Sequence, residues 1–192
     1  QFEYIRKSVL AFNLPSVELI NYEADDLIAT YADKILKEGA KVTIVSSDKD
    51  LMQLYKKNVR IFDPMKNKFI SEEDIQNKFG VDSSKVIDVQ ALAGDNVPGV
   101  PGIGVKTAAE LINKYGNLEK LLKSAHEIKQ NKRRETLIEN KDKALISKEL
   151  VTLKHDAPVD RNLSEFRLKE IDIDKLYKFL REMEFNRLLS SA

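Results

Sequence analysis

The chain has 192 residues, and its 32 Lys and Arg residues nearly balance its 31 Asp and Glu residues. With 42% hydrophobic residues, this composition is typical of a folded globular protein and excludes a disordered polyelectrolyte. No apolar run reaches the roughly 18–20 residues of a membrane span, so we expect no membrane partner. The chain has no cysteine, which excludes disulfides and favours a cytoplasmic location, and its two histidines are too far apart to predict a zinc site. It begins with Gln1 rather than Met, so we interpret it as a fragment.

The pattern before residue 94 alternates between helices and strands. Residues 41–46 are rich in β-branched side chains and form the strongest predicted strand, and residues 71–74 are a capping box that opens a helix ending at Gly80. Strands separated by helices favour a parallel sheet with crossover helices, so we predict an α/β fold. The other expected elements are helices at 2–12 and 23–37, a helix that begins at 51–55, and strands at 17–20 and 59–62.

The main break in the chain lies at 94–104, which holds four of the seven glycines and two of the five prolines. Because Gly and Pro interrupt regular structure, we divide the chain into an α/β core at 1–94 and a helical subdomain at 95–192. Residues 1–104 carry 13 basic and 16 acidic side chains, whereas residues 105–154 carry 12 and 7. The helices expected after the break are 106–115, 118–124, 133–139, 144–153 and 173–189.

Acidic side chains follow two of the predicted strands. Glu23, Asp25 and Asp26 come after the first of these strands, and Asp48 and Asp50 come after the second. Taken singly, each of these acids is explained by a position at a helix start or in a turn. In a parallel sheet, however, the connections that follow the strands meet at one edge, so we expect one crevice. Carboxylates gathered there would need Mg²⁺ or Mn²⁺, and two such ions would suit phosphodiester hydrolysis.

Residues 97–109 form the most specific motif, Val-Pro-Gly-Val-Pro-Gly-Ile-Gly-Val-Lys-Thr-Ala-Ala. The Gly102-Ile103-Gly104 turn leaves backbone N–H groups open directly before a helix, and Lys106 and Thr107 add a charge and a hydroxyl. This arrangement favours a phosphate contact over a plain connection between helices. The basic run at 132–134 either extends that contact or is a solvated helix end.

Three motifs in order, Tyr-Glu-Ala-Asp-Asp, Ser-Asp-Lys-Asp-Leu and Gly-Asp…Asn-Val-Pro-Gly-Val-Pro-Gly-Ile-Gly-Val-Lys-Thr-Ala, resemble the 5′-nuclease domain of bacterial DNA polymerase I, of the flap endonuclease family. The resemblance covers essentially the whole chain. It implies a PIN-like parallel sheet flanked by helices and followed by a helical helix–hairpin–helix subdomain. It further implies a structure-specific 5′-3′ exonuclease and flap endonuclease that uses two Mg²⁺ or Mn²⁺ ions.

By the same resemblance, the catalytic metal ligands are Glu23, Asp25, Asp26, Asp48, Asp50 and Asp95. The DNA-binding residues of the helix–hairpin–helix are Gly102, Ile103, Gly104, Lys106 and Thr107, a site that in the family often also holds K⁺. The implied partner is DNA with a 5′ flap, a nick, a branch or an RNA primer, processed by a monomer during replication and repair in the bacterial cytoplasm.

The chain departs from the family pattern in two places. The family begins with a strand that carries a further metal-binding Asp and continues into a helical arch, and neither precedes Gln1 here. The family also reads Gly-Asp-x-Ser-Asp-Asn where this chain reads Gly94-Asp95-Asn96. We interpret both gaps as skipped residues, which predicts that the Cα separation between Asp95 and Asn96 differs from the roughly 3.8 Å of a trans peptide. The alternative function is a duplex-DNA-binding module without catalysis.

Overall fold

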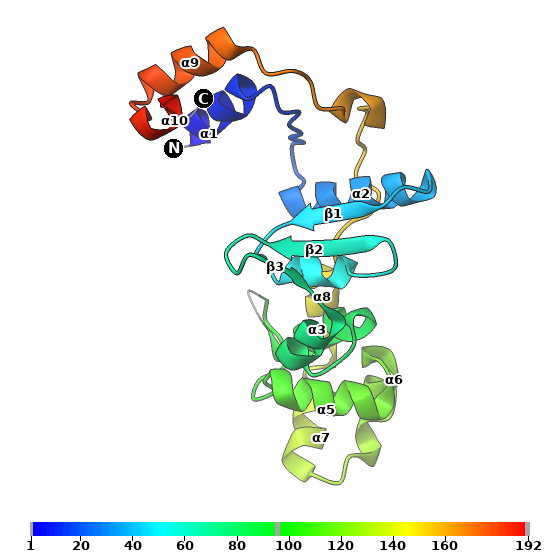
Figure 1. Cartoon of the computed structure of the whole chain (residues 1–192). Helices are drawn as coiled ribbons and strands as arrows, with labels where there is room; N and C mark the ends of the chain where they lie inside the picture. Colours follow the sequence, from blue (N-terminus) through cyan, green and yellow to red (C-terminus); the bar gives the residue numbers. More distant parts are fainter. Residues whose placement is uncertain (1, 95–96, 191–192) are drawn as a thin grey trace. The chain divides into compact units, whose positions relative to one another are not determined.

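Figure 1 shows the computed structural model, in which residues 2–94 and 97–190 are described. The helices are α1 (Phe2–Ala11), α2 (Ala24–Lys37), α3 (Glu72–Phe79), α4 (Val86–Ala93), α5 (Val105–Tyr115), α6 (Leu118–Lys123), α7 (Asn131–Glu139), α8 (Lys141–Val151), α9 (Ile173–Glu182) and α10 (Asn186–Leu189). The strands are β1 (Val42–Val45), β2 (Val59–Asp63) and β3 (Lys68–Ile70), and the short 3₁₀ helices are η1 (Asp50–Leu54), η2 (Ser83–Lys85), η3 (Ala125–Glu127) and η4 (Leu163–Phe166). The predicted separation of Asp95 and Asn96 lies outside the described residues.

The chain divides into two compact units. The central unit is Asp25–Ala157, and the terminal unit combines Gln1–Ala24 with Pro158–Ala192. This division does not follow the predicted boundary after residue 94, because α4, which ends at Ala93, packs against α5 and α8 beyond it. The boundary after residue 94 stays a prediction.

The central unit contains one small mixed sheet. β1 and β2 pair in parallel, with Val42 opposite Val59, and this pair confirms the predicted parallel arrangement. β3 then pairs antiparallel with β2, with Ile61 opposite Ile70. The buried Asp63 makes the turn between β2 and β3, because its carboxylate accepts hydrogen bonds from Met65 N at 3.0 Å and Lys66 N at 3.2 Å.

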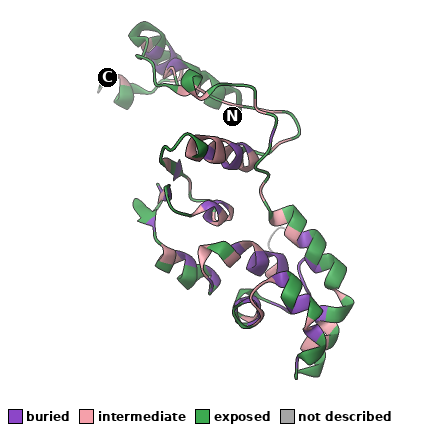
Figure 2. Ribbon diagram, turned by 90° about the vertical axis from the view of Figure 1, so that its right-hand side faces the viewer, coloured by how far each residue is buried: buried purple, intermediate pink, exposed green. Residues whose placement is uncertain are grey.

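The core of the central unit runs from the sheet into the helices behind the Gly/Pro-rich segment. Ile61, Ile75, Leu92, Ile112 and Leu137 are each at most 1% exposed and belong to one cluster. Figure 2 shows buried and exposed positions alternating along these helices, as expected for elements that bury one face. The core therefore fixes the sheet and the helical region of the central unit together.

The terminal unit contains a smaller core of its own, in which Ala11 of α1 packs with Leu176, Phe179 and Leu180 of α9. The predicted helix at 173–189 is interrupted, since α9 ends at Glu182 and Glu184 adopts a left-handed conformation with φ of 54°. The Phe185 N–H donates to Leu180 O at 2.9 Å, which closes the end of the helix as in a Schellman motif.

The strand predicted at 17–20 is wrong: these residues form no strand. The apolar alternation supplies strand propensity, but a strand also needs a neighbour with which to pair its backbone. Ile20 is 86% exposed, and Val17 and Leu19 are only half-buried, so the segment adds no residue to the core.

Candidate active site and nucleic-acid interface

The acidic loop after β1 is held by its own side chains. Ser46 Oγ accepts from Asp48 N at 3.0 Å, and Asp48 Oδ1 accepts from Asp50 N at 2.9 Å. These are turn contacts of the kind that Ser and Asp side chains make with backbone two residues on. They hold Asp48 and Asp50 on one short loop at the carboxyl end of β1, as the sequence predicted.

Asp50 is also tied to α4. Gln90 Nε2 donates to Asp50 Oδ1 at 2.5 Å, and Gln90 is only 4% exposed. The Oε1 atom of Gln90 is buried and has no hydrogen-bond partner among the residues that the structure describes. Sequence analysis missed Gln90, whose one signal was a polar residue inside the otherwise apolar end of α4.

Asp63 is a further acid at this edge of the sheet that sequence analysis missed. It accepts from Ser47 Oγ at 2.6 Å, which joins the end of β2 to the loop after β1. This hydrogen bond lowers the pKa of Asp63 despite burial, and the Met65 and Lys66 N–H groups add to the effect. Asp63 therefore stays ionised and fixes the acidic loop in place.

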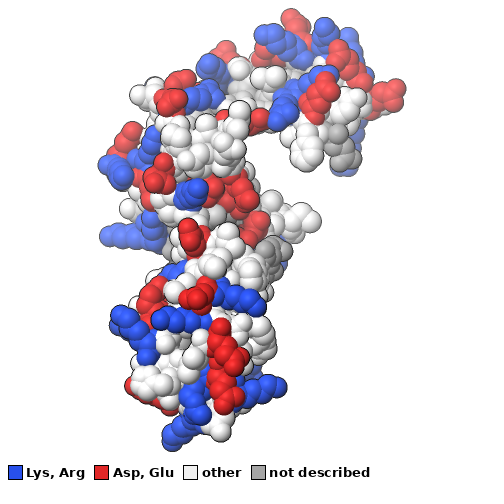
Figure 3. All heavy atoms as spheres, turned by 180° about the vertical axis from the view of Figure 1, so that it is seen from behind, with Lys and Arg blue, Asp and Glu red and all other residues white. Residues whose placement is uncertain are grey.

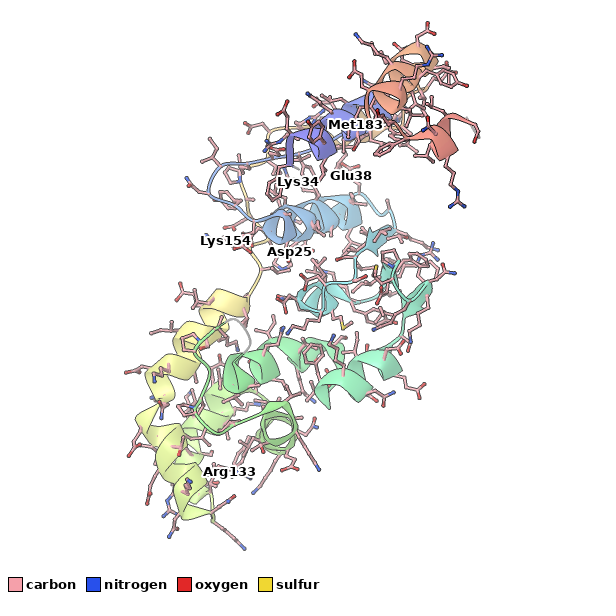
Figure 4. All side chains as sticks on the ribbon, turned by 90° about the vertical axis from the view of Figure 1, so that its left-hand side faces the viewer. Asp25, Lys34, Glu38, Arg133, Lys154 and Met183 are labelled. Carbon is pink, nitrogen blue, oxygen red and sulfur yellow. The ribbon has the colours of Figure 1, made fainter. Side chains whose placement is uncertain are left out.

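The acidic start of α2 is tied to the segment at 154–157. Asp26 Oδ1 accepts from Lys154 N at 2.8 Å, and Thr30 Oγ1 accepts from Ala157 N at 3.1 Å. Figure 4 shows Asp25 at the beginning of α2, beside the segment that carries Lys154. Glu23 belongs to the terminal unit and is described only with that unit.

The donor set fits a hard divalent cation in its chemistry, because every candidate ligand is a carboxylate. Within 2–94 and 97–190, however, no three Asp, Glu or His side chains lie together in a group that could hold a metal ion. The structure thus pairs Asp48 with Asp50 on one loop but does not assemble the predicted crevice from the acids it describes. Asp95 lies outside the described residues, and the assignment of these six acids stays a prediction.

Buried side chains and backbone hydrogen bonds fix the hairpin at 97–104 to α4 and α8. Val100 and Ile103 are 3% and 4% exposed, and Val100 N donates to Leu92 O of α4 at 2.8 Å. Gly99 N donates to the buried Ser147 Oγ of α8 at 3.0 Å. The Ile103 side chain is therefore a core anchor, and only the backbone of this residue remains for the DNA contact predicted for it.

The outer side of the hairpin is open. A Cβ atom added at Gly102 or Gly104 would meet nothing within 4 Å, and Gly102 has φ of 75°. Gly104 caps α5 without a side-chain hydrogen bond, and the first N–H groups of a helix have no partner within the helix. Lys106 is exposed and Thr107 is half-buried in that first turn. This surface can accept a phosphate at close range.

The hairpin and α7 enclose a hollow of about 230 Å³. Arg134 is used internally, since its guanidinium donates to Ile128 O at 3.0 Å and Asn131 Oδ1 at 2.9 Å. Lys132 and Arg133, in contrast, have no acidic partner among the described residues and line the hollow. The residues that line it are Pro101, Gly102, Ile103, Gln130, Lys132, Arg133 and Thr136.

Figure 3 shows basic side chains projecting from the end of the central unit that carries α5 to α7, with acidic side chains between them. Figure 4 places Arg133 at this end, away from Asp25. Two cations of the run at 132–134 thus lie beside the hairpin, while the third makes hydrogen bonds within the fold, and the phosphate contact itself stays a prediction.

Gly99 provides a test of this anchoring. Its Cβ would lie 2.5 Å from the Gly94 Cα, so the two glycines pack backbone against backbone. We expect Gly99→Ala to destabilise the chain by at least about 3 kcal/mol, measured by urea unfolding. Gly39→Ala is the matched control, because Gly39 has φ of 77° but open space around it, and should cost about 1–2 kcal/mol. Equal losses for both variants would show that Gly99 is not tightly packed.

Two family models match the chain in sequence order. Residues 1–80 match the 5′-3′ exonuclease N-terminal resolvase-like domain, and residues 81–174 match the 5′-3′ exonuclease C-terminal SAM fold. The mixed sheet with its helices and the helical region with its glycine hairpin correspond to these two parts. The chain belongs to the 5′-3′ exonuclease family.

Relatives of known name agree with this assignment. The chain is 52% identical over 191 residues to DNA polymerase I of Rhizobium leguminosarum, covering 98% of this chain and 19% of that one. It is 38% identical over 195 residues to a 5′-3′ exonuclease of Aquifex aeolicus, covering 100% of this chain and 66% of that one. The chain therefore spans about a fifth of the polymerase and about two thirds of the exonuclease.

Solved structures share the fold. A mutant of the T5 5′-exonuclease has a TM-score of 0.72 at 24% identity, covering 94% of this chain and 74% of that one. The catalytic core of Rad2 in complex with a DNA substrate has a TM-score of 0.62 at 21% identity, covering 94% of this chain and 63% of that one.

In the described part of the chain, no helix has both the length and the apolar character needed to cross a bilayer.

Proposed function

We propose that the nuclease domain to which this chain belongs hydrolyses DNA phosphodiesters as a structure-specific 5′-3′ exonuclease and flap endonuclease. The observation that carries the proposal is the hairpin. Its Val100 and Ile103 side chains are buried, while Gly102, Gly104 and Lys106 are exposed. It occurs in a chain that matches both family models, one of whose relatives is named a 5′-3′ exonuclease.

The hairpin supports binding to the backbone of duplex DNA rather than to its bases. Backbone N–H groups and cations contact phosphates, which position a protein on DNA without reading sequence. The hairpin offers the open Gly102–Gly104 backbone, and Lys106, Lys132 and Arg133 add three positive charges on the same end of the central unit. Rad2, which shares the fold, was solved with a DNA substrate.

For catalysis, we assign two Mg²⁺ or Mn²⁺ ions to the carboxylates of Glu23, Asp25, Asp26, Asp48, Asp50 and Asp95. When bound, such ions supply an activated water and neutralise charge at the leaving oxygen. The T5 5′-exonuclease was solved with divalent zinc, which supports this assignment. Gln90 and Asp63 contribute by holding the loop of Asp48 and Asp50 against α4 and β2.

The substrates we propose are 5′ flaps, nicks, branches and RNA-primer ends, processed by a monomer during replication and repair in the bacterial cytoplasm. The second candidate function is duplex binding without cleavage, and it is favoured by the lack of a three-acid group among the described residues. Incubation with a labelled 5′-flap duplex in Mg²⁺ or in EDTA separates the two. Cutting only in Mg²⁺ supports the nuclease, whereas binding in both buffers without cutting supports the second candidate.

A further inference from the structure

One cavity lies away from the acidic loop and the hairpin. It has a volume of about 630 Å³ and lies where β1 and β2 begin. The acidic loop follows the opposite, carboxyl end of β1, which is the edge where parallel sheets usually bind their ligands. The cavity is therefore separate from the candidate active site. Its lining residues are Lys41, Val42, Tyr55, Lys56, Lys57, Asn58, Val59, Arg60, Glu72 and Ser83.

The charge in this cavity is unbalanced. Lys56 is paired with Asp33, at 2.9 Å between Nζ and Oδ1. Lys41, Lys57 and Arg60 have no acidic partner among the residues that the structure describes. These three side chains are exposed and give this surface an excess of positive charge, which favours an anion over a cation.

The one acid of the cavity is already engaged. Glu72 accepts from Ser83 N at 2.6 Å and from Ser83 Oγ at 3.0 Å, so both carboxylate oxygens are directed at η2. The Glu72 carboxylate is therefore hydrogen-bonded to η2 and forms no ion pair with the cations that line the cavity. The opening keeps an excess of positive charge.

The backbone and one cation are preorganised. Asn58 has φ of 69°, and this tight turn joins Lys57 to the start of β2. Arg60 donates from Nε to Thr43 Oγ1 at 3.0 Å, and its guanidinium lies 4.7 Å from the centre of the Phe69 ring. Because Thr43 and Phe69 do not line the cavity, these contacts hold the Arg60 guanidinium at its edge, on the exposed face of the sheet.

The remaining walls are apolar or aromatic. Tyr55 is half-buried against the core, and Val42 and Val59 close the cavity floor at the ends of their strands. Most of the lining side chains are polar or charged, and the volume lies within the roughly 300–1,000 Å³ of small-molecule sites. The volume suits a ligand of about the size of a mononucleotide.

From these features we infer that the cavity at the start of β1 and β2 binds a phosphate group carried by a ligand of nucleotide size. Lys41 and Lys57 contact the phosphate, the Asn58 side chain can donate to it, and the Tyr55 side chain provides a surface for the organic part of the ligand. The phosphate has two sources, a free nucleotide or the end of a nucleic-acid strand.

The test is an NMR titration of the full 192-residue chain with four probes: inorganic phosphate, deoxyadenosine monophosphate, deoxyadenosine and a short single-stranded DNA. A free-nucleotide site predicts that the monophosphate shifts the amides of residues 41, 57 and 58, and that deoxyadenosine does not. Shifts at these amides with the oligonucleotide alone identify the strand end as the source. If no phosphate-bearing probe shifts them, the inference is overturned.

Variants then assign the contact. Lys57→Glu should weaken binding of the responding probe by about tenfold or more, as expected when an ionic hydrogen bond is replaced by repulsion. Lys143→Glu on α8 is the matched control, because it makes the same charge change at an exposed lysine outside the cavity. If both variants weaken binding equally, the loss comes from the change in net charge, and the proposed site is contradicted. Amide shifts at residues 102–106 report separately on the hairpin, so the two sites succeed or fail independently.

Discussion

Replacing Asp48 and Asp50 together by alanine is expected to abolish Mg²⁺-dependent cleavage of a 5′ flap by the complete domain while leaving DNA binding intact. Both acids lie on the loop at the carboxyl end of β1, and neither belongs to the hairpin. A loss of at least about 100-fold in rate is expected when groups that stabilise charge in a transition state are removed. The measurements are single-turnover cleavage and, separately, binding in EDTA.

Asparagine variants distinguish the loss of charge from the loss of loop structure. Asn at residue 50 keeps an oxygen that can accept from Gln90 Nε2, and Asn at residue 48 keeps an acceptor for the residue 50 N–H. We expect Asp48→Asn with Asp50→Asn to be as inactive as the alanine pair but to unfold at the wild-type urea concentration. Asp142→Asn in the first turn of α8 is the matched control and should cut normally. If the asparagine pair still cleaves the flap, these carboxylates are not part of the catalytic site.

Lys106→Glu is expected to produce the largest single loss of duplex binding. Lys106 is exposed in the first turn of α5, directly after the open backbone of Gly102 and Gly104. Each phosphate contact contributes about one to the slope of log affinity against log salt, so Lys106→Ala should lower that slope by about 1. The glutamate variant adds repulsion and should weaken binding further.

The same measurement separates the cations of α7. Arg133→Ala should lower the salt slope because its side chain lines the hollow beside the hairpin. Arg134→Ala should instead lower stability, because that guanidinium holds Ile128 O and Asn131 Oδ1. Lys143→Ala on α8 should change neither quantity. If Lys106→Ala leaves the salt slope unchanged, the hairpin is not the phosphate contact.

The elements with a strong local signal were predicted well from the sequence. The β-branched run at 42–45 forms β1, and the capping box of Ser71 and Asp74 opens α3, which ends at Gly80 with φ of 73°. The hairpin was recognised because glycine at 102 and 104 serves a backbone purpose that other residues do not. Each of these signals acts within a few residues of the chain.

The features that were missed depend either on a partner distant in sequence or on an unusual residue in a local turn. The strand expected at 17–20 has propensity but no neighbouring strand, and β3 depends on the turn that Asp63 makes by accepting backbone N–H groups. The end of α9 uses Glu184 in a left-handed conformation where glycine is the usual signal. Local patterns could not reveal which partner each segment would find.

The candidate site shows the same limit. The loop of Asp48 and Asp50 could be predicted because it follows a strand, but its attachment to Gln90 of α4 joins residues 40 positions apart. The convergence of the acids was expected from the geometry of parallel sheets. Within the described residues, no three Asp, Glu or His side chains lie together so that they could hold a metal ion, so the convergence of the acids stays a prediction.

The most direct test of the central claim is cleavage of a 5′-flap duplex by the complete domain, followed on a sequencing gel with Mg²⁺ and with EDTA. The account predicts discrete products near the flap junction in Mg²⁺, none in EDTA, and none with the Asp48→Asn and Asp50→Asn pair. Uncut substrate in Mg²⁺, with the duplex still bound at the hairpin, would contradict the nuclease assignment and leave a DNA-binding module.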